Sequence, residues 1–100
     1  MSASVSNYSI DTNEVFESII KEDQFEFNHV IIKPHFFFSA HPADANVTIT
    51  VVNGDLWLTI AQGSQQIYKK GSVIHVGVGT MSKLGNDSEY PCELFVIKRR

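Results

Sequence analysis

A regular series of short apolar runs, separated by turn residues, most constrains what this chain can fold into. Residues 47–52 read VTITVV and alternate between apolar and polar side chains, as a half-buried strand does. Gly54 follows within a strong turn signal, and residues 56–60 then resume the alternation. Similar runs lie at 25–33, 35–40, 66–69, 72–76, 80–84 and 92–98. About eight short strands without any βαβ pattern predict an all-β sandwich or barrel.

The N-terminal part of the chain departs from this two-residue period. Asp11 can cap a helix, and Glu14 would place an acidic side chain in its first turn. Four apolar residues then share one face at helical spacing, namely Val15, Phe16, Ile19 and Ile20. We therefore predict a short helix over 12–21. It would lie in an N-terminal segment, 1–24, packed on a β-domain, 25–100, in one compact domain.

Composition and charge exclude several classes of function. The chain has 100 residues, which suits one domain. Its net charge of −3 provides neither the basic surface of a nucleic-acid binder nor a polybasic membrane anchor. No apolar run approaches the ~20 residues of a membrane span, and the N-terminus lacks the features of a signal peptide. We therefore expect a cytoplasmic protein. The single cysteine, Cys92, is expected to be a packed core residue.

Two spaced motifs make residues 30–98 resemble the small single-domain cupins. The first motif of that family has the pattern G(X)5HXH(X)3–4E(X)6G, and its successive positions fall on His35, His41, Ala43, Val47 and Gly54. The second has the pattern G(X)5PXG(X)2H(X)3N, and its positions fall on Gly71, Gly77, Gly79, Ser82 and Asn86. The resemblance implies a cupin-type antiparallel jelly-roll barrel.

The residues at these positions change the chemistry that the resemblance implies. In metal-dependent cupins, the two histidines and the glutamate of the first motif and the histidine of the second hold a divalent metal ion. Here only His41 is retained, because Ala43 and Val47 cannot coordinate a metal and Ser82 is at best a weak ligand. We therefore predict no metal, no other cofactor and no catalytic residue.

Two enzymatic alternatives stay open. His41 could rebuild a metal site together with His35 and His75. It could also act as a metal-free base beside Tyr68 or Tyr90, as in the sugar-nucleotide epimerases of the cupin fold. We consider a non-catalytic protein the better interpretation.

Loss of the metal ligands makes the predicted barrel interior more apolar. Such an interior can be a pocket for a small molecule or can simply be filled by side chains. The residues predicted to line the pocket are His41, Val47, Ile49, Ser82, Leu84 and Phe37. The function that follows is binding of a small apolar molecule, or a regulatory role.

Large apolar side chains also fall on the predicted outer face. Residues 36–38 are three consecutive phenylalanines, so their rings project from both faces of a strand. If Leu56 and Leu58 face the interior, Trp57 faces outward. Exposed apolar groups in a row often mark an interface, and we therefore predict a homodimer. A dimeric scaffold without a ligand is the third alternative.

Overall fold

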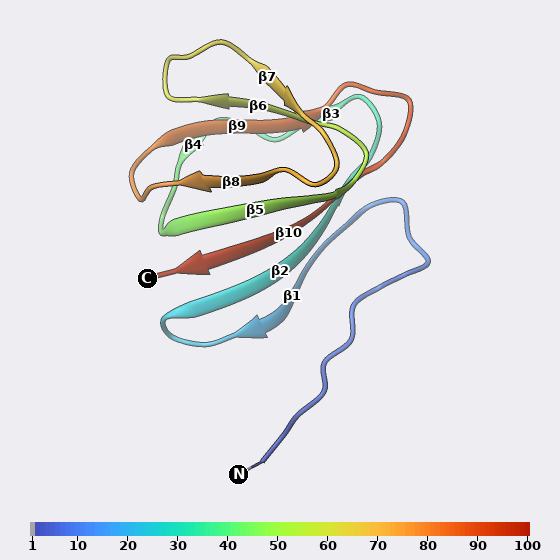
Figure 1. The fold of residues 1–100 in the computed structure, drawn as a ribbon, viewed down its shortest axis with the longest axis vertical. Coiled ribbons are helices and arrows are strands. Elements are labelled where there is room, and N and C mark those ends of the chain that lie inside the picture. Colours follow the sequence, from blue (N-terminus) through green and yellow to red (C-terminus); the bar gives the residue numbers. More distant parts are fainter. Residues whose placement is uncertain (1) are drawn as a thin grey trace.

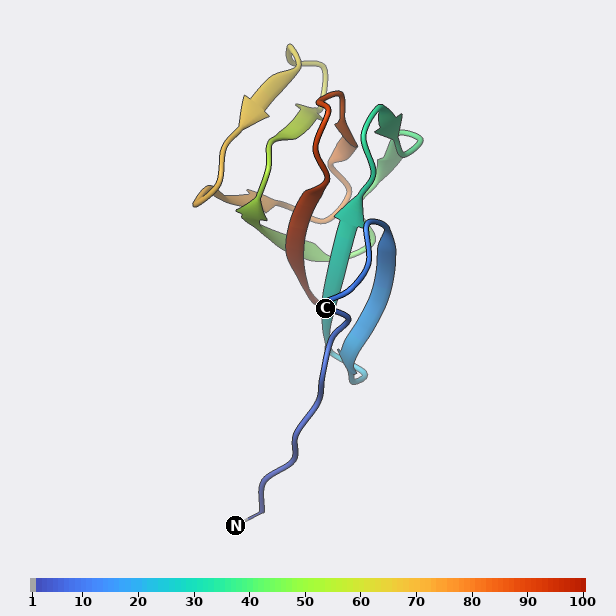
Figure 2. The ribbon, with the colours of Figure 1, turned by 90° about the vertical axis from the view of Figure 1, so that its right-hand side faces the viewer.

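The computed structural model describes residues 2–100, which form two antiparallel sheets (Figure 1). The first sheet has, in spatial order, β1 (Val15–Lys21), β2 (Phe25–Ile32), β10 (Cys92–Arg99), β5 (Asn46–Asn53) and β8 (Val73–Val76). The second has β3 (Phe36–Phe37), β9 (Met81–Asn86), β6 (Leu56–Ile60) and β7 (Gln66–Tyr68), and β4 (His41–Pro42) also pairs with β9. The sheets face each other, and the N-terminal residues lead away from the barrel (Figure 2).

The prediction of an N-terminal helix over 12–21 is wrong, because this segment contains β1, an antiparallel partner of β2. A β-bulge between Ser18 and Ile20 explains the misleading pattern. The extra residue shifts the two-residue alternation by one position. Apolar residues on both sides of the bulge therefore imitate the spacing of a helical face. Among residues 2–100 there is no helix, and hence none that is long and apolar enough to cross a membrane.

The strand predictions from alternation are confirmed in the centre of the barrel. The predicted run 56–60 is β6, and 47–52 lies within β5. Leu56 and Leu58 are almost fully buried while Trp57 between them is only half-buried, so Trp57 faces outward as predicted. The predicted run 35–40 forms only the two-residue strand β3. The rest of that segment follows β9 through single contacts, such as the hydrogen bond from the Phe38 amide to the Leu84 carbonyl.

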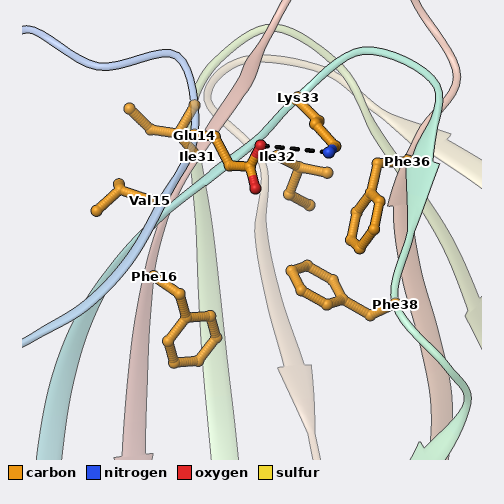
Figure 3. Close-up of a pocket in the computed structure, with 8 residues that line it drawn as sticks. All are labelled: Glu14, Val15, Phe16, Ile31, Ile32, Lys33, Phe36 and Phe38. Atoms are coloured by element: carbon orange, nitrogen blue, oxygen red, sulfur yellow. Dashed lines mark ion pairs between the residues drawn. The ribbon is translucent and has the colours of Figure 1, made fainter.

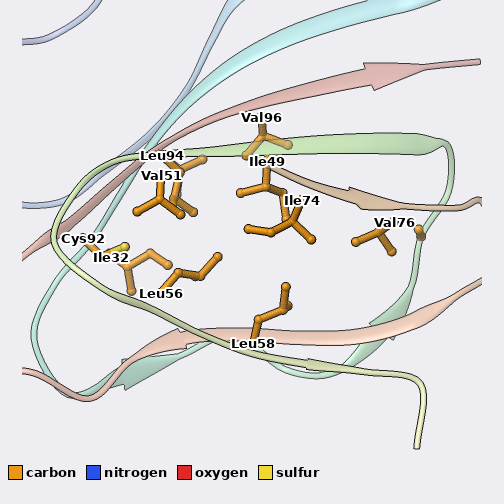
Figure 4. Packing of buried hydrophobic residues seen from close by; sticks show 12 residues of the cluster. Ile32, Ile49, Val51, Leu56, Leu58, Ile74, Val76, Cys92, Leu94 and Val96 are labelled. Atoms are coloured by element: carbon orange, nitrogen blue, oxygen red, sulfur yellow. The ribbon is translucent and has the colours of Figure 1, made fainter. Parts of the chain in front are cut away.

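The core fills the space between the two sheets (Figure 4). Its buried members are Val30, Ile32, Ala43, Ile49, Val51, Leu56, Leu58, Ile74, Val76, Cys92, Leu94 and Val96. Most of them alternate with more exposed residues along their strands, as expected when one face of each sheet is buried. Burial of these side chains is the main favourable term for folding.

The residues that set the motif spacing have structural tasks. Gly54 has a φ of +76°, and a Cβ atom at this position would collide with the backbone of Pro91. The fully buried Asn86 side chain donates hydrogen bonds to the carbonyls of Ile32 and Tyr90, at 3.0 and 2.7 Å. Its carbonyl oxygen accepts from the Ser88 amide and hydroxyl. Asn86 therefore fixes the loop before β10 rather than facing a ligand.

Candidate functional site

A cavity of about 280 Å³ opens at one end of the barrel, and we call it the mouth cavity. It lies between the first sheet and the segment that follows β3. Its lining consists of Phe16, Val30, Phe38, Ser39, His41, Leu84, Leu94, Val96 and Lys98. Six of these nine side chains are aliphatic or aromatic, and the polar ones are Ser39, His41 and Lys98. This composition is typical of a small-molecule site.

The structure brings two of the predicted pocket residues, His41 and Leu84, to the mouth cavity. Ser82 is buried directly opposite His41 in the β4–β9 pairing. Val47 and Ile49 face the interior from β5, where Ile49 is only 2% exposed and Val47 packs against the core. These two residues therefore fill the barrel beside the cavity rather than line it.

Phe37 lies apart from this group, on the outer face of the second sheet. It pairs with Gly85 of β9, and its ring covers that glycine. The Lys83 ammonium lies 5.5 Å from the centre of the ring. Successive strand residues point to opposite faces, so Phe38 lines the cavity while Phe37 does not.

Lys98 is the main polar residue that the sequence analysis missed. Cys92, Leu94, Val96 and Lys98 occupy alternate positions of β10 and share its inward face. The period-two pattern of residues 92–98 contains this signal, because it places a lysine at the end of an otherwise apolar row. Lys98 Nζ lies 3.4 Å from the Asp44 carboxylate, and its positive charge lowers the pKa of Asp44.

His41 supplies a second polar group to the lining of the mouth cavity. Its Nδ1 lies 3.2 Å from the Ser39 carbonyl oxygen. A carbonyl can only accept, so Nδ1 carries the proton and donates this bond. Its Nε2 makes no hydrogen bond to residues 2–100. The hydrogen bond of Nδ1 to Ser39 fixes the orientation of the ring and therefore the direction of Nε2.

The positions of the cupin metal ligands do not suit a metal ion in this chain. Ala43 and Val47 present only methyl groups, and His41 is exposed. No cluster of three or more His, Cys, Asp or Glu side chains suited to a metal occurs within residues 2–100. His35 instead binds carboxylates in the loop after β9, and His75 bonds Thr48 on the first sheet. The three histidines of the rebuilt-site alternative therefore do not converge.

A buried ionic cluster on the outer face of the first sheet was not predicted. His29 of β2 is fully buried, with Nδ1 at 2.8 Å from Glu17 and Nε2 at 2.6 Å from Glu93. Each ring nitrogen of His29 therefore lies within hydrogen-bonding distance of a carboxylate. The rings of Tyr8 and Phe95 lie 4.8 and 5.2 Å from its centre. The cross-strand pair of His29 and Glu17 was hidden by the helix prediction.

This cluster also determines the charge state of its carboxylates. The pKa of Glu17 is lowered, first by a hydrogen bond from the Ser9 amide and then by His29. For Glu93, burial raises the pKa, but hydrogen bonds from His29 and Asn53 outweigh it and the net shift is downward. Both carboxylates are therefore ionised at neutral pH. The cluster ties β1, β2, β10 and the N-terminal residues together.

Comparison with known proteins identifies proteins of similar sequence and similar fold. No family model matches the chain. An uncharacterised protein from Methanocaldococcus jannaschii is 21% identical over 85 residues, which cover 85% of this chain and 73% of that protein.

Solved structures resemble the chain over nearly its whole length. An RmlC-like cupin family protein with a double-stranded β-helix fold, also from Methanocaldococcus jannaschii, superposes with a TM-score of 0.92 at 21% identity. The match covers 99% of this chain and 92% of that one. The cupin domain of Schizosaccharomyces pombe Cnp3 gives a TM-score of 0.80 at 20% identity, over 93% of this chain and 68% of that one. The chain thus has the double-stranded β-helix, or jelly-roll, fold of the RmlC-like cupins.

Proposed function

We propose that this protein is a non-catalytic cupin that binds a small, largely apolar molecule with an anionic group in the mouth cavity. The observation that carries the proposal is the inward-facing Lys98 at the end of an apolar row. Within residues 2–100 its ammonium forms one ion pair, with the exposed Asp44 carboxylate, so it keeps donors for an anion. The Asp44 side chain is 66% exposed, so water can solvate its carboxylate when a ligand anion takes its place beside Lys98.

The apolar part of the ligand would contact Val30, Leu84 and Val96, which line the cavity from both sheets. His41 would add a directed polar contact through Nε2, since its Nδ1 is held by Ser39. A metal-dependent reaction has no support in the side chains present at the family's metal positions. Elemental analysis of purified protein tests this part: near-stoichiometric iron, manganese, nickel or zinc would contradict it.

The binding proposal is tested by a thermal-shift screen followed by calorimetry. Small aromatic and aliphatic carboxylates are compared with the corresponding amides. A carboxylate at 100 times its Kd should add about 2.7 kcal/mol to the free energy of unfolding. Lys98→Met should weaken binding of the acid, while Lys83→Met, on the outer face of β9, serves as a matched control. If no acid is bound, or if both variants behave alike, the proposed site is wrong.

We further propose that the chain forms a homodimer through the outer face of the second sheet. Phe37, Trp57 and Ile67 follow one another across β3, β6 and β7, with Gly85 of β9 between the first two. Ile67 is 49% exposed. Light scattering after gel filtration gives the mass, and Ile67→Lys should shift a dimer to the monomer. A wild-type monomer at high concentration would contradict this proposal.

A further inference from the structure

A second cavity, of about 310 Å³, lies beside the mouth cavity, and we call it the seam cavity (Figure 3). It occupies the gap between β1, at the edge of the first sheet, and the segment around β3, at the edge of the second. Val15 and Phe36 line it on opposite sides, and it shares Phe16 and Phe38 with the mouth cavity. The two cavities are therefore neighbours separated by a pair of aromatic rings.

Phe16 is the movable part of this partition. Its side chain is 66% exposed, although it is a large apolar group on the inward-facing side of an edge strand. Its ring lies edge-on to Phe38, with centroids 6.4 Å apart, whereas Phe38 is also held by Phe36 at 5.1 Å. Exposed side chains change rotamer within nanoseconds, and an aromatic pair contributes little beyond its buried area. Phe16 can therefore turn aside without disturbing the core.

The polar groups lie at the two ends of the combined space. Lys98 and His41 are at the mouth end. At the other end, Lys33 forms an ion pair of 3.4 Å with Glu14, and its ammonium also lies over the Phe36 ring. The walls between these ends are aromatic and aliphatic. This distribution of charge suits a ligand with one anionic end and an unbranched apolar body.

We propose that the two cavities accommodate the hydrocarbon chain of a fatty-acid-type carboxylate, with its carboxylate at Lys98 and its chain passing between Phe16 and Phe38. This inference rests on the proposed function and specifies the class of ligand. Ligand pockets have volumes of about 300–1,000 Å³, so the mouth cavity alone is at the lower limit. With the seam cavity added, the space falls within that range.

The test is calorimetry with hexanoate, octanoate, decanoate and dodecanoate, each below its micelle concentration. If the chain enters the seam cavity, affinity should continue to rise beyond octanoate, by up to roughly fourfold per added methylene. Glu14 lines the seam cavity and its side chain points across the gap to Lys33, so Glu14→Trp should narrow the cavity and abolish this gain while leaving hexanoate binding unchanged (Figure 3). The control for an added tryptophan is Val73→Trp, because Val73 is exposed on β8, far along the first sheet.

A measurement on the unmodified protein tests the inference if Glu14→Trp does not fold. Dodecanoate should shift the NMR signals of the Phe36 ring, and hexanoate should not. If hexanoate binds but longer acids bind no better and leave Phe36 unchanged, the inference is wrong while the proposed function stands. If no acid binds at all, both are wrong. In that case, the oligomeric state should be measured. If the protein is a dimer and Phe16→Ala converts it to a monomer, the seam cavity is an interface with a second copy of the chain.

Discussion

Replacement of His29 by phenylalanine tests whether the buried ionic cluster holds the first sheet together. The substitution keeps an aromatic ring beside Tyr8 and Phe95 but removes both charge-assisted hydrogen bonds. Each such bond contributes ~1.5–3 kcal/mol. The side chains of Glu17 and Glu93 are 28% and 21% exposed, so they recover part of this loss by binding water. We therefore expect His29→Phe to lower the free energy of unfolding by about 2–4 kcal/mol.

Urea unfolding, followed by the fluorescence of the single tryptophan, Trp57, measures this loss directly. The control is His75→Phe, because His75 lies on β8 of the same sheet but is exposed, with a single side-chain hydrogen bond within residues 2–100, to Thr48. It should change stability by no more than ~0.5 kcal/mol. If His29→Phe costs less than about 1 kcal/mol, or no more than the control, the cluster does not stabilise the sheet as argued.

The same cluster predicts how stability depends on pH. The pKa values of Glu17 and Glu93 are lower in the folded chain than their ordinary value of 4.5. Their contribution to stability is therefore fully present above that value and is lost as the pH falls through the folded-state pKa. In His29→Phe the partner responsible for part of this lowering is absent. Its stability should decline less steeply in acid than that of the unmodified protein, as shown by urea titrations between about pH 6 and 3.

Three further predictions follow from single contacts. Gly85→Ala should lower the free energy of unfolding by about 1–3 kcal/mol, because its Cβ would collide with the Phe37 ring. In a Phe37→Ala background this loss should disappear, and urea unfolding of the unmodified protein, the two single variants and the double variant measures it. Cys92 should resist a thiol reagent until the chain unfolds, because burial raises its pKa to about 12; rapid labelling at neutral pH would contradict its placement. Hydrogen bonds to Asp87, and then to a second carboxylate of the same loop, raise the pKa of His35, so an NMR titration should place it above 6.5. Its contribution to stability should be present below that value and be lost as the pH rises through the folded-state pKa.

The parts of the fold that the sequence predicted correctly are those in which local pattern and burial agree. The alternation runs from Val47 to Val51 in β5 and along β6, and a glycine turn joins the two strands, so their inward faces follow from the order of these residues alone. β1 could not be derived in this way, because its bulge breaks the period. Nothing in residues 12–21 alone shows that β2 offers them a free edge. Tertiary pairing therefore overrode a plausible local preference.

The candidate site, too, could be predicted only in part from the sequence. Motif spacing located His41 and showed that the metal ligands are absent, but it directed attention to the middle of the barrel, where Ile49 is packed. The cavity lies instead at the open end, where the last inward position of β10 is a lysine rather than an aliphatic residue. Burying an unpaired ammonium is costly, so an inward lysine persists only at a rim where it reaches water, Asp44 or a ligand. For this reason Lys98, more than the retained His41, supports the proposal that the cavity binds a ligand.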